Sequence, residues 1–464
     1  MLETFAQLTL GDLRRYIEES GTGVLQTPAG EPDWTALLGP ATNDSRDVKP
    51  GGLFVALQGE HSDGHRFAGA AASQGASALL LAHLPEQELP RLPSVIWLAS
   101  DPLQALQGFA GWWRSRFPDL RVIGITGSVG KTTTKDVIAA ALATQMPVLA
   151  SPRSFNNEIG LPLTLLSLSG EHRAAVLEMG IFDVGDIAFL AGIARQNVGV
   201  VLNVDAVHLE RAGSIERIAA AKQEMIDTLP PGGISILNYD DPRVLPMAAM
   251  APGPVLTFGL EQGADWQGVD IEATPDGLTL TLIHAGDRFP IRSALPGRHH
   301  AYALLAAAAT LDAIGVLPQH IAEALAAVPA PAARQRFRRG VSDRLVIDDS
   351  YNASPLSMSA ALELLAAQAA PRRVAILADM LELGPISEDK HRQVGEWAAA
   401  MADLVIAVGP QARFIADAAG RNATWFPDKA AFREHIDSLL RPGDAVLVKG
   451  SRGMEMEEVV AWLL

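Results

Sequence analysis

The chain has 464 residues, of which 48% are hydrophobic and 19% charged, a composition typical of globular proteins with two to four domains. Its formal net charge of −16 argues against a nucleic-acid or anionic-membrane partner, and the absence of cysteine excludes disulfides, thiolate metal sites and a cysteine nucleophile. There is no apolar run of the roughly 18 residues that a membrane span needs, and no secretory signal pattern, so we expect a cytoplasmic protein.

The chain divides into three segments with different patterns of predicted strands, turns and helices. Residues 1–98 mix short apolar strands with glycine-rich turns. Residues 99–330 begin with an amphipathic helix and then alternate buried strands with helices, and residues 331–464 repeat that alternation after an Ala/Pro linker at 328–333. Continuous apolar strands separated by helices are typical of a mostly parallel sheet covered on both faces. The sequence therefore predicts an α/β protein with three domains.

In the first segment, polar and cationic residues flank the apolar run 53–57. Asp44-Ser45-Arg46 precede this run, and Asp63-Gly64-His65-Arg66 follow it. The two groups could together seat a phosphorylated ligand, although each could equally be an ordinary loop.

The most informative motif lies between a predicted strand at 122–125 and a predicted helix at 135–142. Glycines in such a turn let backbone N–H groups approach phosphate oxygens, and the helix N-terminus adds partial positive charge. Lysine in this pattern reaches the β- and γ-phosphates, and the following hydroxyl ligates magnesium. Ile125 stands where the strict pattern has its first glycine, so the loop is a variant, and a chance glycine turn is the alternative. The predicted nucleotide-binding residues are Gly127, Ser128, Val129, Gly130, Lys131, Thr132 and Thr133.

Glu178 follows the predicted strand 174–177 in the same segment. A carboxylate at the carboxyl end of a parallel strand points into the ligand crevice, where it could hold magnesium. The alternative is a strand-end carboxylate that is simply solvated. The phosphate loop in the same segment favours the metal role.

Lys222 interrupts the apolar stripe of a predicted helix at 214–229, seven residues after Ile215 and three before Met225. Burial lowers the pKa of a lysine, but a snorkelling lysine is the commoner explanation of such a pattern. His208 follows the predicted strand 198–204 and is a candidate metal ligand, with a satisfied loop histidine as the alternative.

The third segment predicts strands at 345–347, 374–377, 404–408 and 445–448, each followed by a helical stretch, which indicates a doubly wound domain. It has no G-x-G-x-x-G turn, so we expect no dinucleotide there. Asp348-Asp349-Ser350-Tyr351-Asn352 suit recognition of ribose, base or amine, or form an Asx-type turn. Lys449-Gly450-Ser451-Arg452-Gly453 are predicted to open the final helix as a second anion-binding helix start.

Taken together, these segments resemble the Mur ligase family over nearly the whole chain. The residues that carry the resemblance are Asp44-Ser45-Arg46, Pro50-Gly51, residues 54–57, Asp63-Gly64-His65, Thr126-Gly127-Ser128, residues 130–133, residues 156–160, Pro162, Glu178-Met179-Gly180, Asn203, His208-Leu209-Glu210, Lys222, residues 348–353, Asp379-Met380, Glu382-Leu383-Gly384 and residues 449–454. The stretches D-D-S-Y-N-A and D-M-x-E-L-G are specific to one member, whereas the phosphate loop marks a wider family that includes folylpolyglutamate synthases.

The resemblance implies a domain for a UDP moiety at 1–98, an ATP-binding domain at 99–330 and a Rossmann-like ligase domain at 331–464. It implies an ATP-dependent amide ligase of peptidoglycan precursor synthesis, which adds D-alanyl-D-alanine to UDP-N-acetylmuramoyl-tripeptide through an acyl phosphate. A monomer is expected.

The resemblance also implies residue roles. Lys131, Lys222 and His208 are expected to be catalytic. Two magnesium ions are expected on Thr132, Glu178, His208 and a carbamylated Lys222, and the chemistry agrees because only a neutral amine reacts with carbon dioxide and burial favours that form. Nucleotide contacts are expected from Asp348 and Asn352 besides the phosphate loop. Substrate contacts are expected from Ser45, Arg46, Asn156, Asn157, Asp349 and Tyr351.

One departure affects the nucleotide base. The family usually has Gly-x-His-Asn-x-x-Asn where this chain has Gly297-Arg298-His299-His300-Ala301-Tyr302-Ala303. The second asparagine, replaced by Ala303, typically contacts adenine, so we expect rearranged adenine recognition, through His300. Two alternatives stay open: another Mur-type or folylpolyglutamate-type ligase, and a nucleotide-driven ATPase switch that makes no bond.

Overall fold

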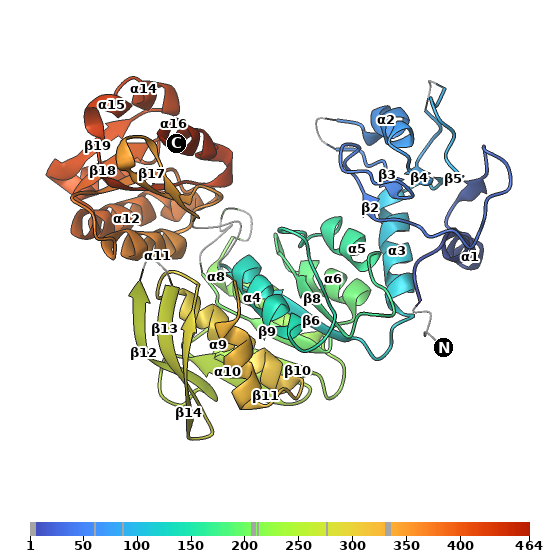
Figure 1. Ribbon diagram of the computed structural model, residues 1–464, viewed down its shortest axis with the longest axis horizontal. Helices are drawn as coiled ribbons and strands as arrows, with labels where there is room; N and C mark the ends of the chain where they lie inside the picture. Colours follow the sequence, from blue (N-terminus) through green and yellow to red (C-terminus); the bar gives the residue numbers. More distant parts are fainter. Residues whose placement is uncertain are drawn as a thin grey trace.

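The computed structural model describes residues 6–59, 62–85, 88–205, 210, 213–274, 277–329 and 336–464. Three sheets follow one another along the chain, and the second lies between the first and the third (Figure 1). Within the described ranges, every helix is too short or too polar to cross a membrane. The predicted α/β class with three domains is confirmed, while the domain boundaries at 98 and 330 stay predictions.

The first sheet has five strands in the order β1-β5-β4-β3-β2, parallel except for β1. Its elements are α1 (Leu10–Ser20), β1 (Val24–Gln26), β2 (Ala41–Thr42), β3 (Leu53–Val55), α2 (Ala68–Ser73), β4 (Ala78–Leu81) and β5 (Val95–Leu98). Helix α1 begins at a capping box, in which Thr9 accepts the N–H of Asp12 and the Asp12 carboxylate accepts the N–H of Thr9. It ends at Gly21, whose φ of 67° is the left-handed conformation that glycine adopts without strain.

Helix α3 (Pro102–Arg114) joins the first and second sheets through one apolar core. The Tyr16 ring of α1 lies 5.2 Å from the ring of Phe109 on α3. On the side of α3 that meets the second domain, Trp113 Nε1–H donates to the carbonyl of Leu168 at 3.0 Å. Because this apolar cluster is continuous, the first two domains pack directly against each other.

The second sheet has nine strands in the order β14-β13-β12-β11-β10-β9-β6-β8-β7. Its strands are β6 (Arg121–Thr126), β7 (Val148–Ala150), β8 (Ala174–Glu178), β9 (Val198–Val201), β10 (Ile234–Asn238), β11 (Val255–Gly259), β12 (Trp266–Thr274), β13 (Gly277–His284) and β14 (Asp287–Ser293). Its helices are α4 (Lys131–Ala143), α5 (Gly160–Leu165), α6 (Asp186–Ala194), α8 (Ile215–Asp227), α9 (His300–Ala313) and α10 (Pro318–Ala326).

Helices cover both faces of this sheet, as predicted. In β6, Val122 belongs to the core that contains α3, α5, α6 and α8, whereas Ile123 and Ile125 belong to the core that contains α4, α9 and α10. The antiparallel strands β12, β13 and β14 were not predicted. In β13 and β14, buried residues alternate with less buried ones, so these strands lack the continuous apolar runs that marked the parallel strands.

The third sheet has six strands in the order β15-β16-β20-β17-β18-β19, parallel except for β15. The strands are β15 (Arg336–Arg339), β16 (Leu345–Asp349), β17 (Arg373–Ala378), β18 (Leu404–Val408), β19 (Ala423–Phe426) and β20 (Ala445–Lys449). One face packs on α11 (Pro355–Ala366), α12 (Ser387–Met401) and α13 (Arg413–Ala419). The other packs on α14 (Lys429–Arg433), α15 (Ile436–Leu439) and α16 (Glu457–Leu463).

Two predictions about the third segment need correction. Strand β16 runs through Asp348 and Asp349, which the sequence placed after it, because both residues pair in register with β20. The final helix does not open at 449–453: a 3-10 turn at Arg452–Met454 intervenes, and Glu455 in the left-handed region (φ 50°) separates this turn from α16. Residues 449–453 are therefore the end of β20 and a turn, not a helix start.

Candidate functional site

A cavity of about 870 Å³ lies where the carboxyl-terminal ends of strands in the second sheet face loops of the third. Its second-domain lining comes from residues 128–134, Ser154, Asn156, Glu178, Phe182, Leu202, Asn203, Asn238, residues 240–243, Phe258, His299, His300, Tyr302 and Ala303. Its third-domain lining comes from Asp349, residues 351–354, Leu356, Ser357, Ala360, residues 381–383, Lys449 and residues 451–453. Ligands of doubly wound sheets bind at such strand ends.

The phosphate loop forms one wall of this cavity. Gly130 caps α4 with a φ of 87°, and a Cβ at Gly127 would lie 2.8 Å from Leu202 Cβ, so both positions need glycine. The Asn203 amide clamps the loop, because it accepts the Val129 N–H at 2.9 Å and donates to the Val129 carbonyl at 3.0 Å. Lys131 Nζ donates to the Gly127 carbonyl at 2.7 Å. Helix α4 thus points its N-terminus and a lysine at the cavity.

Ile125 explains why the first glycine of the strict pattern is absent. It is a fully buried residue of β6 that pairs with Val200 on one side and Glu178 on the other. The strand continues through Thr126, and the turn itself starts at Gly127. A large apolar side chain at 125 serves the core of the sheet.

Thr132 and Glu178 meet at the base of the loop. Thr132 Oγ1–H donates to Glu178 Oε2 at 2.8 Å, and Asn156 Nδ2–H donates to Glu178 Oε1 at 2.8 Å. The Glu178 residue is only 2% exposed, and among the described residues no cation pairs with its carboxylate. A buried carboxylate surrounded by neutral oxygen and amide groups fits a magnesium ion, which prefers hard oxygen ligands.

A second cavity of about 230 Å³ shares Lys131 with the lining of the first. Its lining includes Lys131, Asn156, Asn157 and Lys222, which brings together four residues that the sequence singled out separately. Burial, and then the positive charge of Lys131, hold the pKa of Lys222 well below its ordinary value. Within the described part of the chain, Lys222 makes no hydrogen bond or salt bridge, which fits a neutral amine that can accept carbon dioxide. His208 lies outside the described residues.

The nucleotide base was expected at the part of the large cavity that the start of α9 lines. His300 lines it at the start of α9 and hydrogen-bonds the Pro296 carbonyl through Nδ1. Burial, and then the nearby His299, lower the pKa of His300 to about 3. Tyr302 Oη–H donates to Asp240 Oδ2 at 2.9 Å, and burial and this bond raise the pKa of the Tyr302 phenol. Ala303 also lines the cavity and offers no side-chain donor.

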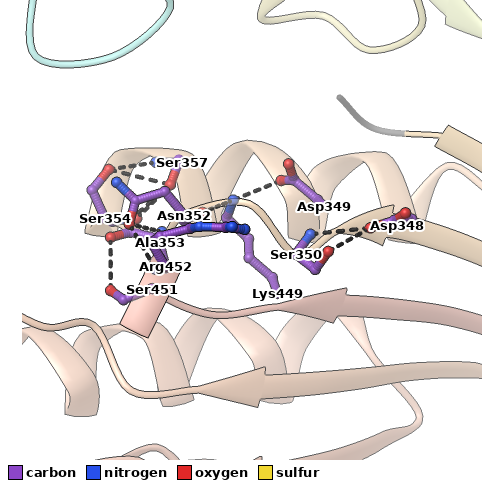
Figure 2. A network of polar contacts seen from close by, with 10 residues as sticks. All are labelled: Asp348, Asp349, Ser350, Asn352, Ala353, Ser354, Ser357, Lys449, Ser451 and Arg452. Carbon is purple, nitrogen blue, oxygen red and sulfur yellow. Dashed lines mark hydrogen bonds and ion pairs between the residues drawn. The ribbon is translucent and has the colours of Figure 1, made fainter. Parts of the chain in front are cut away.

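The third-domain wall is a polar network around Asp349 and Lys449 (Figure 2). Lys449 Nζ donates to Asp349 Oδ2 at 2.6 Å and to the Asn352 carbonyl at 2.9 Å. Asp349, Tyr351 and Asn352 line the cavity, while the substrate and nucleotide contacts expected of them stay predictions. Asp348 does not line it, because its carboxylate accepts from the Ser350 hydroxyl at 2.7 Å and lies 3.8 Å from Arg338.

The structure does not bring Ser45 and Arg46 to either cavity. Arg46 pairs with Asp44 at 2.6 Å, and its side chain is 87% exposed. This pairing and the Arg46 backbone N–H lower the pKa of Asp44 to about 2. These residues lie at the edge of the first sheet, on the loop after β2.

The sequence reasoning missed two residues that shape the site. Lys135, one helical turn after Lys131, is buried and donates at 2.7 Å to the carbonyls of Ser151 and Arg153, which holds the segment that carries Ser154 and Asn156. Ser154 Oγ lies 3.4 Å from both Thr132 Oγ1 and Tyr351 Oη. In the sequence, the i, i+4 spacing of Lys131 and Lys135 was the one signal that could have pointed to Lys135.

Comparison with known proteins agrees with this geometry. Family models described as the Mur ligase middle domain, the Mur ligase glutamate ligase domain and the Mur ligase family catalytic domain match residues 125–311, 333–452 and 41–111. An α/β protein with a phosphate loop facing a Rossmann-like third domain is the architecture of these ATP-dependent ligases, and the chain belongs to the Mur ligase family.

Three relatives illustrate the similarity. UDP-N-acetylmuramoyl-tripeptide--D-alanyl-D-alanine ligase of Escherichia coli strain K12 is 38% identical over 428 residues, which is 91% of this chain and 93% of that protein. The crystal structure of MurF from Acinetobacter baumannii has a TM-score of 0.85 at 28% identity and covers 99% of both chains. MurF ligase from Thermotoga maritima, solved in complex with ADP, has a TM-score of 0.76 at 28% identity and covers 91% of this chain and 96% of that one.

Proposed function

We propose that the protein is an ATP-dependent amide ligase that joins D-alanyl-D-alanine to UDP-N-acetylmuramoyl-tripeptide in peptidoglycan precursor synthesis. The observation that carries this proposal is a single cavity with a phosphate loop on one wall and the Asp349–Asn352 loop on the other. A phosphoryl donor and an amine substrate can meet in such a cavity. The name of the E. coli relative supplies the particular substrates.

The three domains divide the work in this proposal. Residues 1–98 hold the UDP moiety, residues 99–330 hold ATP, and residues 331–464 present the amine substrate. Ser45 and Arg46 lie away from both cavities, as contacts to a long nucleotide-sugar substrate can. The proposal takes the protein to work as a monomer, in the cytoplasm where ATP is available.

The reaction has two steps. An oxygen of the tripeptide carboxylate attacks the γ-phosphorus of ATP, the bond to the β–γ bridging oxygen breaks, and ADP and an acyl phosphate form. The neutral amine of D-alanyl-D-alanine then attacks the acyl carbon, inorganic phosphate leaves, and the amine proton is lost. The first step brings an anion against a polyanion, so charge neutralisation and positioning dominate the catalysis.

Lys131 supplies much of that neutralisation. It lines both cavities, so its ammonium can contact the β- and γ-phosphates in one and the carboxylate that arrives from the other. The N–H groups of residues 127–133 and the α4 N-terminus contact the phosphate oxygens. Asn156 and Asn157 line the smaller cavity and orient the tripeptide end, while Asp349, Tyr351 and Asn352 bound the side from which the amine approaches.

Two magnesium ions belong to this proposal. Thr132 and Glu178 would hold one, and His208 with a carbamylated Lys222 would hold the other. When bound, they would neutralise phosphate charge and orient the phosphates. Two observations support these assignments: the buried Glu178 carboxylate has no cation paired with it among the described residues, and burial lowers the pKa of Lys222.

The decisive experiment measures phosphate release with each substrate omitted in turn. The ligase needs ATP, the UDP-linked tripeptide and the dipeptide together. Hydrolysis of ATP with neither other substrate would instead identify a nucleotide-driven switch. A panel of UDP-peptides, folates and amino acids separates this ligase from other Mur-type and folylpolyglutamate-type enzymes and identifies the third residue of the tripeptide.

A further inference from the structure

Lys449 is a buried cation on the cavity wall that the mechanism above leaves without a role. It ends β20 in register with Asp349 on β16, and its side chain is 2% exposed. Figure 2 shows the ammonium reaching from β20 toward the Asp349 carboxylate. Lys449 nevertheless belongs to the lining of the large cavity.

The Lys449 ammonium has a donor to spare. An ammonium carries three N–H donors. Within the described residues it uses two, one to Asp349 Oδ2 at 2.6 Å and one to the Asn352 carbonyl at 2.9 Å. An unused donor on a buried cation is unfavourable unless an acceptor meets it, so a ligand oxygen in the cavity would complete its bonding.

The surrounding loops hold this donor in place. The Asn352 Oδ1 atom accepts the backbone N–H of Arg452 at 3.3 Å, and the Ser451 hydroxyl accepts the backbone N–H of Leu381 at 2.8 Å. The loops after β16, β17 and β20 are thereby tied together around Lys449. Because this donor is already held in place, binding an oxyanion does not cost free energy to reorganise it.

The local charges favour a directed contact over a general attraction. Asp349 balances Lys449, and Arg452 pairs with Glu457 at 2.9 Å. Glu382 also lines this wall, so the wall carries no excess positive charge, and an anion gains mainly from the N–H that points to it.

We propose that Lys449 forms an oxyanion subsite on the third-domain wall, where its third N–H binds a carboxylate or phosphoryl oxygen of a substrate. This rests on the proposed ligase function, whose substrates offer two such groups near that wall. One is the free carboxylate of D-alanyl-D-alanine, and the other is the terminal phosphate of ATP.

The test compares ligands that differ only in the oxyanion, in wild type and in Lys449→Gln. Ligation is measured with D-alanyl-D-alanine and with its carboxamide, and the affinities of ATP and ADP are measured by calorimetry. A charged hydrogen bond corresponds to about a tenfold or larger effect. If the subsite binds the carboxylate, the carboxamide raises KM about tenfold in wild type and this ratio falls to near one in Lys449→Gln. If it binds the phosphate, the ATP-to-ADP affinity ratio falls instead.

Equal ratios in wild type and variant, for both ligand pairs, would overturn the proposal. A purely structural role lowers binding of both members of a pair alike, so it leaves each ratio unchanged. Lys429→Gln is the matched control, because Lys429 pairs with Glu458 at 2.7 Å in the same domain and does not line the cavity.

One additional pair of variants and one ligation-independent measurement keep the experiment decisive. If Lys449→Gln does not fold, the ratios are compared between Asp349→Asn and the double variant Asp349→Asn/Lys449→Gln. The Asp349→Asn substitution removes the carboxylate that Lys449→Gln would leave buried without a counter-charge. If wild type joins no dipeptide, the proposed ligase function fails, whereas the ATP and ADP measurements still test Lys449 because they need no ligation.

Discussion

The Thr132 hydroxyl donates a 2.8 Å hydrogen bond to the Glu178 carboxylate, which links the first turn of α4 to the last residue of β8. These residues are 46 positions apart in the chain. They meet because β6, which leads into the phosphate loop, pairs with β8. The carboxylate that the proposal assigns to magnesium is thus placed beside the phosphate loop by strand pairing.

Glu178→Gln should lower ligation-dependent phosphate release at least about 100-fold, because the amide keeps the shape of the side chain but removes its charge. The magnesium concentration for half-maximal activity should rise. A magnesium titration of initial rates measures both effects. Glu363→Gln, at an exposed residue of α11, is the control. An unchanged magnesium dependence in Glu178→Gln would contradict the metal assignment.

Lys131→Ala should abolish phosphate release, with a loss of at least about 100-fold, because the variant loses the cation that lines both cavities. The helix N-terminus stays, so weak ATP binding should persist in calorimetry. Lys390→Ala on α12 serves as the control. Full activity of Lys131→Ala would remove the phosphate-binding role of the loop.

Lys222→Ala should lose activity that short carboxylic acids partly restore, because an added carboxylate can occupy the space of a carbamate in the smaller cavity. Rates are measured across a series of such acids. Native mass spectrometry should show a mass gain matching one carbamate in wild type and none in Lys222→Ala. An active enzyme with unmodified Lys222 would count against the carbamate.

His300 should make the protein less stable in acid. Its folded-state pKa of about 3 lies below its ordinary value of 6.5, so below about pH 6.5 the unfolded chain binds a proton that the folded chain does not. The free energy of unfolding should therefore fall as the pH drops from about 6.5 toward 3, by at most about 1.4 kcal/mol per pH unit from this group.

Urea unfolding of wild type and His300→Asn between pH 8 and pH 4 checks this slope. The stability of wild type relative to His300→Asn should decrease toward acid. His435→Asn, at an exposed histidine, should keep the wild-type slope. A parallel pair of curves for wild type and His300→Asn would show that His300 titrates normally.

Much of the site could be predicted because its signals are local. The phosphate loop needs only neighbouring glycines, a lysine and a helix start, and all of these lie within residues 126–133. Lys222 stood out because the helical periodicity places this charged residue on an apolar face. The structure shows that it is buried. By contrast, the alternating pattern of β12–β14 gave weaker evidence than continuous apolar runs, and the strands were missed.

The sequence alone determined the α/β class, the phosphate loop and the polar residues at the strand ends, because each depends on residues adjacent in the chain. Only the tertiary structure decided which of those strand ends face one another. The Asp349–Lys449 pair spans 100 positions, and the Tyr351–Ser154 approach spans 197. Such contacts depend on strand order and on how the second and third domains pack, which no local pattern of residues encodes.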